Sequence, residues 1–150
     1  MSKLTTILPF AFFLLIGANC KITKNVNYEE RLKEAEVYDY KLTYFRKLLL
    51  EGFNHSDAVK NLLSNDASKG IADPALSTYD NEFLDSCVKV DNLVIIKDSV
   101  RRDSLFKQGK IAEGNQGKYV FSYALERFNS KWLDSLAKAR YSVYKKLEAE

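Results

Sequence analysis

The chain has 150 residues, of which 23 are Lys or Arg and 20 are Asp or Glu, so its formal net charge at pH 7 is +3. This length corresponds to one domain with a single hydrophobic core. The near balance of charges excludes the strongly basic surface of a typical nucleic-acid-binding protein, so we expect no nucleic-acid partner. With one His and two Cys, and no recognisable catalytic motif, we also expect no metal, no cofactor and no enzymatic activity.

The first twenty residues have the pattern of an export signal. Lys3 places a positive charge near the start, and the apolar run over residues 7–18 is interrupted only by Pro9. This run is shorter than the roughly 20 residues that a membrane-spanning helix requires. Small residues then come before Cys20. A charged start, a short apolar core and small residues before a cleavage point predict a cleaved signal peptide.

The end of this segment, Gly17-Ala18-Asn19-Cys20, resembles a lipobox, the processing and acylation site of bacterial lipoproteins. Its Asn directly before the Cys is similar to the relaxed lipoboxes of Bacteroidota. The resemblance implies a protein whose new N-terminus, Cys20, carries palmitate-type acyl chains. The implied organisation is a signal peptide over 1–19, a lipidated Cys and short tether over 20–26, and one helical domain over 27–150.

The residues after Cys20 bear on the destination of such a lipoprotein. Lipoproteins kept at the inner membrane often begin Cys-Asp, whereas here Lys21 follows the Cys. Bacteroidota lipoproteins sent to the cell surface tend to carry acidic residues at this point, and residues 21–27 contain none. The resemblance therefore implies a lipid-anchored outer-membrane protein that faces the periplasm, with exposure at the cell surface left open.

The domain begins with a predicted long helix. Asn27 is expected to cap it, with Glu30 three residues later as in a capping box, and Gly52 is expected to end it. A second, short helix is predicted from about Ser56 to Asn65. The apolar residues expected to face the core from the first helix are Tyr28, Ala35, Leu42 and Leu49, with Tyr38 and Phe45 between them and Leu32 and Leu48 beside them.

A third helix is predicted from Asp73-Pro74, a capping residue followed by Pro at the first helical position. The apolar run 93–96 is expected to continue it, and residues 97–117 are expected to be polar and irregular. Cys87, unpaired once Cys20 is lipidated, is expected to be a small buried residue. The predicted buried face follows spacings of three and four: Leu76, Tyr79, Phe83, Cys87, Val90 and Val94.

The last segment, 118–148, is predicted to be one helix about 45 Å long. Together these segments predict an all-α fold, a small bundle of about four helices with a long C-terminal helix. The apolar residues expected to face the core from the last helix are Phe121, Leu125, Phe128, Trp132, Leu136, Ala139, Val143 and Leu147.

Two pairs of tyrosines four residues apart are candidate partner-binding residues: Tyr40 with Tyr44, and Tyr119 with Tyr123. Rings at this spacing lie on one face of a helix. Most such rings belong to a core with the hydroxyl reaching the surface. The alternative is a groove that binds a partner, since Tyr and Trp are enriched at interfaces.

Three tripeptides, Asp98-Ser99-Val100, Asp103-Ser104-Leu105 and Asp134-Ser135-Leu136, resemble the O-glycosylation sequon of exported Bacteroidota proteins. The resemblance makes Ser99, Ser104 and Ser135 candidate modification sites. The alternative is that Asp and Ser are simply common on exposed helix turns.

These features favour a non-catalytic lipoprotein that serves as a binding or accessory subunit of an envelope complex. Its expected partner is an outer-membrane or periplasmic protein. An inhibitor or immunity lipoprotein, and a carrier of a small apolar ligand, are the alternatives. A pocket lined by Tyr and Phe would favour the carrier, whereas an exposed apolar surface would favour protein binding.

Overall fold

The computed structural model describes residues 28–66 and 78–148. They form five α-helices: α1 (Tyr28–Gly52), α2 (Asp57–Ser64), α3 (Thr78–Lys107), α4 (Val120–Phe128) and α5 (Lys131–Glu148). The predicted all-α fold, a small helical bundle with a long C-terminal helix, is confirmed. Within the described ranges, no helix combines the length and apolar character needed to cross a membrane. The expected signal peptide, Cys20 and the tether lie outside the described residues.

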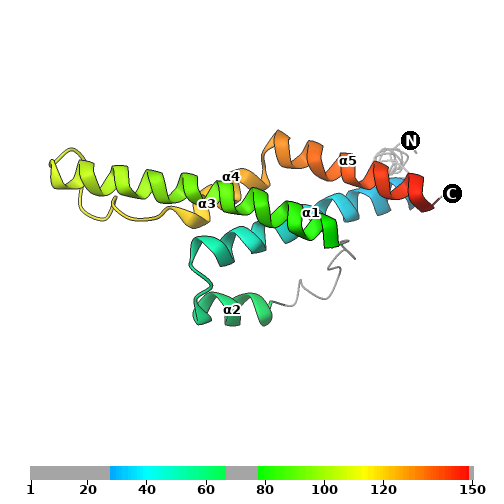
Figure 1. The fold of residues 1–150 in the computed structure, drawn as a ribbon, viewed down its shortest axis with the longest axis horizontal. Helices are drawn as coiled ribbons and strands as arrows, with labels where there is room; N and C mark the ends of the chain where they lie inside the picture. Colours follow the sequence, from blue (N-terminus) through cyan, green and yellow to red (C-terminus); the bar gives the residue numbers. More distant parts are fainter. Residues whose placement is uncertain (1–27, 67–77, 149–150) are drawn as a thin grey trace, which may run out of the picture.

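Helix α1 is the centre of the bundle, because it contacts each of the other four helices. Helix α3 runs parallel to it: Lys47 Nζ lies 2.6 Å from Asp85 Oδ1, and further along both helices Asn92 lies near Glu51. Helices α4 and α5 return in the opposite direction on another side of α1 (Figure 1). The parallel pair α1 and α3 therefore requires the crossover that contains α2.

The core lies between α1, α3, α4 and α5. Small residues on the returning helices, Ala124 and Ala137, are fully buried and let those backbones approach α1 closely. The larger buried side chains come from α1 and α3 and from the starts of α4 and α5. They are Tyr40, Tyr44, Leu48, Leu49, Leu84, Val88, Ile95, Val120 and Leu133.

The predicted buried faces of α3 and the last helix are wrong by about one residue. Asp91 is 1% exposed, whereas its neighbour Val90 is exposed; Leu133 is fully buried, whereas Trp132 is 40% exposed. Of the residues expected to face the core from α3, Phe83, Val90 and Val94 are exposed. Cys87 is partly buried against the core, and Leu76 and the side chain of Tyr79 lie outside the described part of the chain. The prediction for α3 is wrong because a hydrophobic pattern assigns any carboxylate to the surface, whereas Asp91 is buried.

The segment 118–148 is two helices. Ser130 separates them: its hydroxyl donates to the carbonyl of Arg127, and its Oγ accepts the backbone N–H of Leu133 at 3.2 Å. A serine that accepts an N–H three residues later is an N-cap, so Ser130 starts α5. The break changes the chain direction after Phe128 and leaves α5 as the long C-terminal helix.

Helix α3 is longer than predicted, because residues 97–107 are helical and not irregular. Pairs of side chains three and four residues apart stabilise this part locally. Asp98 accepts from Arg101 at 2.7 Å and from Arg102 at 2.6 Å. Such pairs raise helix stability without any contact to the rest of the bundle, which a search for apolar periodicity does not detect.

The second half of α3 projects beyond the bundle (Figure 1). Asn92 lies opposite Glu51, next to the last residue of α1, and α3 continues to Lys107, roughly 22 Å further. Residues 108–119 return along it. We call α3 residues 96–107 with this returning chain the projecting segment.

Contacts near the base of the projecting segment hold the returning chain. The Gly117 N–H donates to Asp103 Oδ1 at 3.1 Å, and the Arg102 guanidinium lies 4.0 Å from the centre of the Tyr119 ring. Lys118 Nζ donates to the Gly52 carbonyl at 3.2 Å. A cation at the last carbonyl of α1 is favoured by the helix dipole, so Lys118 ties the returning chain to the bundle.

Candidate functional site

The most connected polar group is the Asp91 carboxylate, at the centre of the bundle. Its Oδ2 accepts from the Tyr44 hydroxyl at 2.6 Å and from Arg127 Nε at 2.6 Å. Its Oδ1 accepts from Arg127 Nη2 at 2.8 Å and from the Tyr123 hydroxyl at 3.1 Å. We call Asp91, Tyr44, Tyr123 and Arg127 the Asp91 cluster; it joins α1, α3 and α4.

The electrostatics of this cluster are those of a stable buried ion pair. Burial alone would raise the pKa of Asp91, but hydrogen bonds from Arg127 and Tyr44 outweigh it and hold the pKa below its ordinary value. Burial and the hydrogen bond to Asp91 raise the pKa of the Tyr44 hydroxyl. Each carboxylate oxygen of Asp91 already accepts two hydrogen bonds, so Asp91 has little capacity left to bind a ligand. The cluster instead fixes how the three helices pack.

The four candidate tyrosines are not brought into one groove. Tyr40 and Tyr44 are buried in the core, which fits the first of the two alternatives given for them. Tyr123 is half-buried and donates to Asp91. Tyr119 is half-buried under Arg102, and its hydroxyl donates to Asn115 at 3.2 Å. All four rings thus take part in contacts within the chain.

A second ion pair joins α3 to α5. Arg140 Nε lies 2.6 Å from Asp80 Oδ1, and both side chains are largely buried. Tyr40 lies near this pair: burial, with the nearby Asp80 charge, raises the pKa of its hydroxyl to about 12. The first half of α3 is therefore held by ion pairs at Asp80 and Asp91, with Leu84 and Val88 packed between them.

Four aromatic rings form a continuous row between α1 and α4. The ring centres are 5.7 Å apart for Tyr38 and Phe128, 5.9 Å for Phe128 and Phe45, and 6.0 Å for Phe45 and Phe121, all edge-to-face. Tyr38 and Phe121 at the ends are more than half exposed. This row holds α4 on α1 and leaves aromatic surface in contact with solvent.

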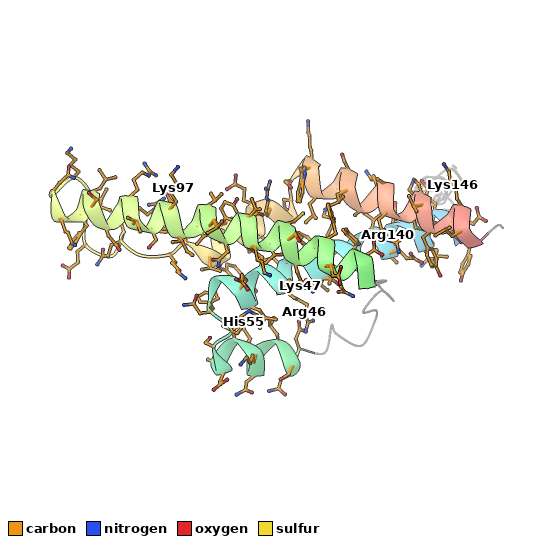
Figure 2. All side chains as sticks on the ribbon, viewed as in Figure 1. Arg46, Lys47, His55, Lys97, Arg140 and Lys146 are labelled. Atoms are coloured by element: carbon orange, nitrogen blue, oxygen red, sulfur yellow. The ribbon has the colours of Figure 1, made fainter. Side chains whose placement is uncertain are left out.

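Several exposed apolar side chains lie on one side of α3. Leu93 and Val100 are 65% and 64% exposed, and Val90 and Val94 are also exposed. Lys89, Lys97 and Arg101 are exposed among them. We call these seven residues the outer face of α3. Figure 2 shows Lys97 extending from α3 into open space. The sequence pattern predicts that Val90 and Val94 face the core, whereas both are exposed in the structure.

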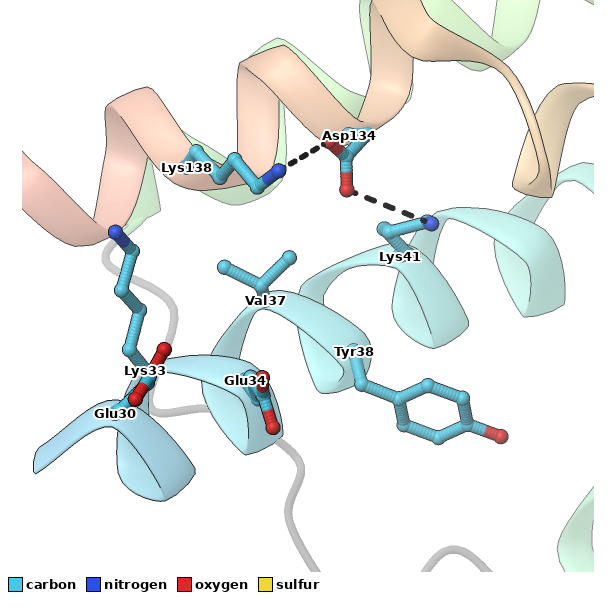
Figure 3. Close-up of a pocket in the computed structure, with 8 residues that line it drawn as sticks. All are labelled: Glu30, Lys33, Glu34, Val37, Tyr38, Lys41, Asp134 and Lys138. Atoms are coloured by element: carbon cyan, nitrogen blue, oxygen red, sulfur yellow. Dashed lines mark ion pairs between the residues drawn. The ribbon is translucent and has the colours of Figure 1, made fainter. Parts of the chain in front are cut away.

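Two open grooves are lined mainly by charged side chains. The larger, about 440 Å³, lies between the first half of α1 and α5. Asp134 on its wall pairs with Lys138 at 2.7 Å and faces Lys41 at 3.9 Å (Figure 3). The second, about 340 Å³, lies between α1 and α3 near Lys47 and Asp85. Neither has the aromatic, apolar lining that a carrier of a small apolar ligand needs.

The residues that could support metal or thiol chemistry lie apart. Within 28–66 and 78–148 there is no group of three or more His, Cys, Asp or Glu placed to bind a metal ion. His55 is exposed in the turn after α1, with its Nε2 2.9 Å from Glu51 Oε2. Cys87 is partly buried against the core, and burial raises the pKa of its thiol, which keeps it in the less reactive protonated form.

The three candidate glycosylation serines all lie on helices. Ser104 on α3 and Ser135 on α5 are exposed, and Ser99 on α3 is partly buried. The hydroxyl of Ser104 accepts from the Gln108 amide at 3.1 Å. Ser104 and Ser135 are therefore accessible to a modifying enzyme, and Ser99 is less so.

Comparisons with protein-family models, curated proteins and solved structures found no match for this chain. The functional argument therefore depends on the exposed surfaces and on the export pattern of the sequence.

Proposed function

We propose that this protein is a lipid-anchored outer-membrane lipoprotein, facing the periplasm, that acts as a non-catalytic binding or accessory subunit of an envelope complex. The observation that carries the proposal is the outer face of α3, where four large apolar side chains are exposed in one row. Contiguous apolar surface is costly to leave in water and is typical of a binding site. The address depends on the lipobox-like sequence at Cys20.

The distribution of polar groups supports binding over catalysis. The most perturbed titratable groups belong to the Asp91 cluster, where both carboxylate oxygens are paired with the two tyrosine hydroxyls and with Nε and Nη2 of Arg127. The single His is exposed and paired with Glu51. The two grooves that the described residues form are open and charged, so they give no support to a ligand carrier. An inhibitor or immunity lipoprotein is a special case of the same binding function.

The shape of the domain bears on its reach. Helix α1 begins at the end of the bundle where α5 ends, and the projecting segment lies at the opposite end (Figure 1). The length of α1 and the projection of α3 sum to roughly 60 Å. An anchor at Cys20 therefore allows the projecting segment to reach a partner well away from the membrane surface, even though the tether itself spans only about 25 Å.

The anchor is tested by following a labelled fatty acid in cells that express the wild type, Cys20→Ala and the matched variant Cys87→Ala. We expect the wild type and Cys87→Ala to take up label and fractionate with the outer membrane, and Cys20→Ala to do neither. Absence of label in the wild type would contradict the lipoprotein assignment.

The binding function is tested by affinity purification of the full-length protein from native membranes. We expect a partner protein in a fixed stoichiometric ratio. A wild-type protein that purifies alone under mild detergent and low salt would contradict a role as an accessory subunit.

A further inference from the structure

We infer that the outer face of α3 docks into an acidic, apolar-lined groove on a partner protein; this names the partner surface for the binding function proposed above and depends on that function. The outer face is exposed, has the spacing of one side of a helix, carries basic residues and runs from the packed half of α3 onto its projecting half. Each of these is a property of residues within 82–107.

The apolar residues of this face have the spacing of a helix that binds in a groove. Val90, Leu93 and Val100, with Lys97 between them, follow each other at intervals of three, four and three. Side chains at this spacing form one row along a helix. Groove-binding helices present anchors in this way, with large apolar side chains entering successive pockets.

The charged residues of the face have one sign. Lys89 and Lys97 are exposed, and neither forms an ion pair with the described residues. Lys89 borders the groove that Glu51 and Asp85 also line, whereas Lys97 lies away from it. Arg101 pairs with Asp98, yet its side chain is 66% exposed. The acidic residues of α3 mostly lie elsewhere: Asp80, Asp85, Asp91 and Asp98 pair with basic side chains. Glu82, near the start of α3, is the exception on this side.

This charge pattern favours an acidic partner over a second copy of the chain. Two outer faces brought together would place lysines and Arg101 against each other, and like charges at an interface cost several kcal/mol. An acidic groove instead pairs with Lys97 at the centre and with Lys89 and Arg101 at the sides. Steering by such complementary charge also speeds association.

The order of apolar and charged residues on the outer face also favours a protein over a lipid surface as the binding partner. A helix that lies in the membrane interface has a continuous apolar side with aromatic anchors and basic residues on the other side. Here Lys97 stands in the middle of the apolar row, between Leu93 and Val100, and the row itself contains no aromatic residue. A groove in a protein can place a carboxylate at that one position, whereas the acyl layer that would cover Leu93 and Val100 cannot.

The first experiment places a photo-crosslinking amino acid at Leu93, and a control at Lys131 on α5, in the full-length protein expressed in its native cell. Lys131 is exposed and lies off the outer face. We expect crosslinks from Leu93 but not from Lys131, to one protein, at a peptide rich in Asp or Glu and in apolar residues. Crosslinks to another copy of this chain, to a neutral or basic peptide, or to no protein would overturn the inference.

The second experiment measures binding of the crosslinked protein, purified on its own, to the wild type, Lys97→Glu and Lys131→Glu. Both substitutions make the same charge change on an exposed side chain. We expect Lys97→Glu to weaken binding about tenfold, Lys131→Glu to have little effect, and added salt to reduce the difference. Equal affinities for the three proteins would contradict the inference.

The remaining arms separate this inference from the proposed function. Melting curves of both variants should match the wild type, because neither side chain packs in the core. Binding of wild type, but not Lys97→Glu, to vesicles of equal parts phosphatidylethanolamine and phosphatidylglycerol would assign the face to lipid and overturn the inference. If the wild type is acylated and keeps a stoichiometric partner while Lys97→Glu keeps it equally well, the inference fails and the function stands.

Discussion

The two halves of α3 differ in what holds them. The first half, residues 80–95, buries Leu84, Val88 and Ile95 and carries two charges paired with residues of α4 and α5. The second half, residues 96–107, has its strongest contacts within itself, between Asp98 and the arginines that follow it. One uninterrupted helix is thus stabilised by tertiary packing at one end and mainly by local pairs at the other.

This difference shows that a helix can extend beyond the core that holds its first half when local ion pairs support it. The same residue types, Asp and Arg, serve both halves, but the Asp91 carboxylate is 2% exposed, whereas the Asp98 carboxylate is 33% exposed. Breaking a buried pair is costly, whereas an exposed pair contributes little. The following substitutions test that contrast.

The largest expected effect is that of Asp91→Ala. It leaves the Tyr44 hydroxyl and the Arg127 guanidinium without their partner inside the bundle, and it should lower the free energy of unfolding by about 3–5 kcal/mol. The matched change in the projecting half, Asp98→Ala, should cost at most about 1 kcal/mol. Urea denaturation followed by circular dichroism measures both. Equal losses would show that the two halves are equally stabilised by their ion pairs.

Truncation of apolar side chains should show the same contrast. Leu84→Ala removes a fully buried side chain and should cost about 2–5 kcal/mol, because it leaves a cavity against α1. Val100→Ala changes an exposed residue of the projecting half and should stay within about 0.5 kcal/mol. Thermal unfolding of the two variants provides the comparison, and a large loss for Val100→Ala would mean that another part of the chain covers this position.

Gly52→Ala tests the close contact between the end of α1 and the start of α4, which lies near the point where α3 leaves the bundle. A Cβ at Gly52 would lie 2.4 Å from Val120 Cγ1, so α4 would have to shift away from the end of α1. We expect a loss of about 1–3 kcal/mol. In the double variant with Val120→Ala the loss should be smaller than the sum of the two single losses, because the clash is absent. Strict additivity would contradict the close approach.

Trp132→Ala should have a moderate effect. The ring lies 4.5 Å from the Arg127 guanidinium and makes an edge-to-face contact with Tyr44, but it is 40% exposed. We expect a loss of about 1–2 kcal/mol in chemical denaturation. Leu133→Ala, next to it and fully buried, should cost more. The reverse order would restore the apolar face that the sequence predicts for the last helix.

Acid should lower the free energy of unfolding gradually, and by less than the substitutions above. The reason is that a protonated Asp91 carboxyl still forms hydrogen bonds. The folded-state pKa of Asp91 is below its ordinary value, so the unfolded chain binds more protons and stability falls as the pH falls. The contribution is complete above about pH 4 and is lost below it. In urea titrations between about pH 5 and pH 2, the wild type should lose more stability than Asp91→Asn; parallel losses would assign the acid sensitivity to other groups.

Much of the secondary structure follows from the sequence, because caps and glycines are local signals. Gly52 ends α1 and the short α2 lies where it is predicted. Which side of each helix is buried was harder to predict, for two reasons. Helix α1 is central and buries residues on several sides, so no single apolar row describes it. Helix α3 buries the Asp91 carboxylate, so the spacing of its apolar residues predicts the wrong side of the helix as the buried one.

The Asp91 cluster was not predictable from periodicity. Tyr44 is 47 residues before Asp91 and Arg127 is 36 residues after it, so only tertiary structure brings them together. One signal was present in the sequence: a single Asp within the largely apolar stretch 88–96. The outer face of α3 was missed for the same reason. Because Asp91 lies on the buried side of α3, the apolar residues that periodicity assigned to the core lie on the exposed side.

The distance in sequence between Asp91 and Arg127 also orders the folding of a newly made chain. As the polypeptide is made from its N-terminus, α1, α2 and α3 are complete before Arg127 exists. Until α4 arrives, packing α3 on α1 would bury a carboxylate without its guanidinium, which opposes closure. We therefore expect α3 to pack stably on α1 only after Arg127 has emerged, so that the chain is loosely packed while it is being made.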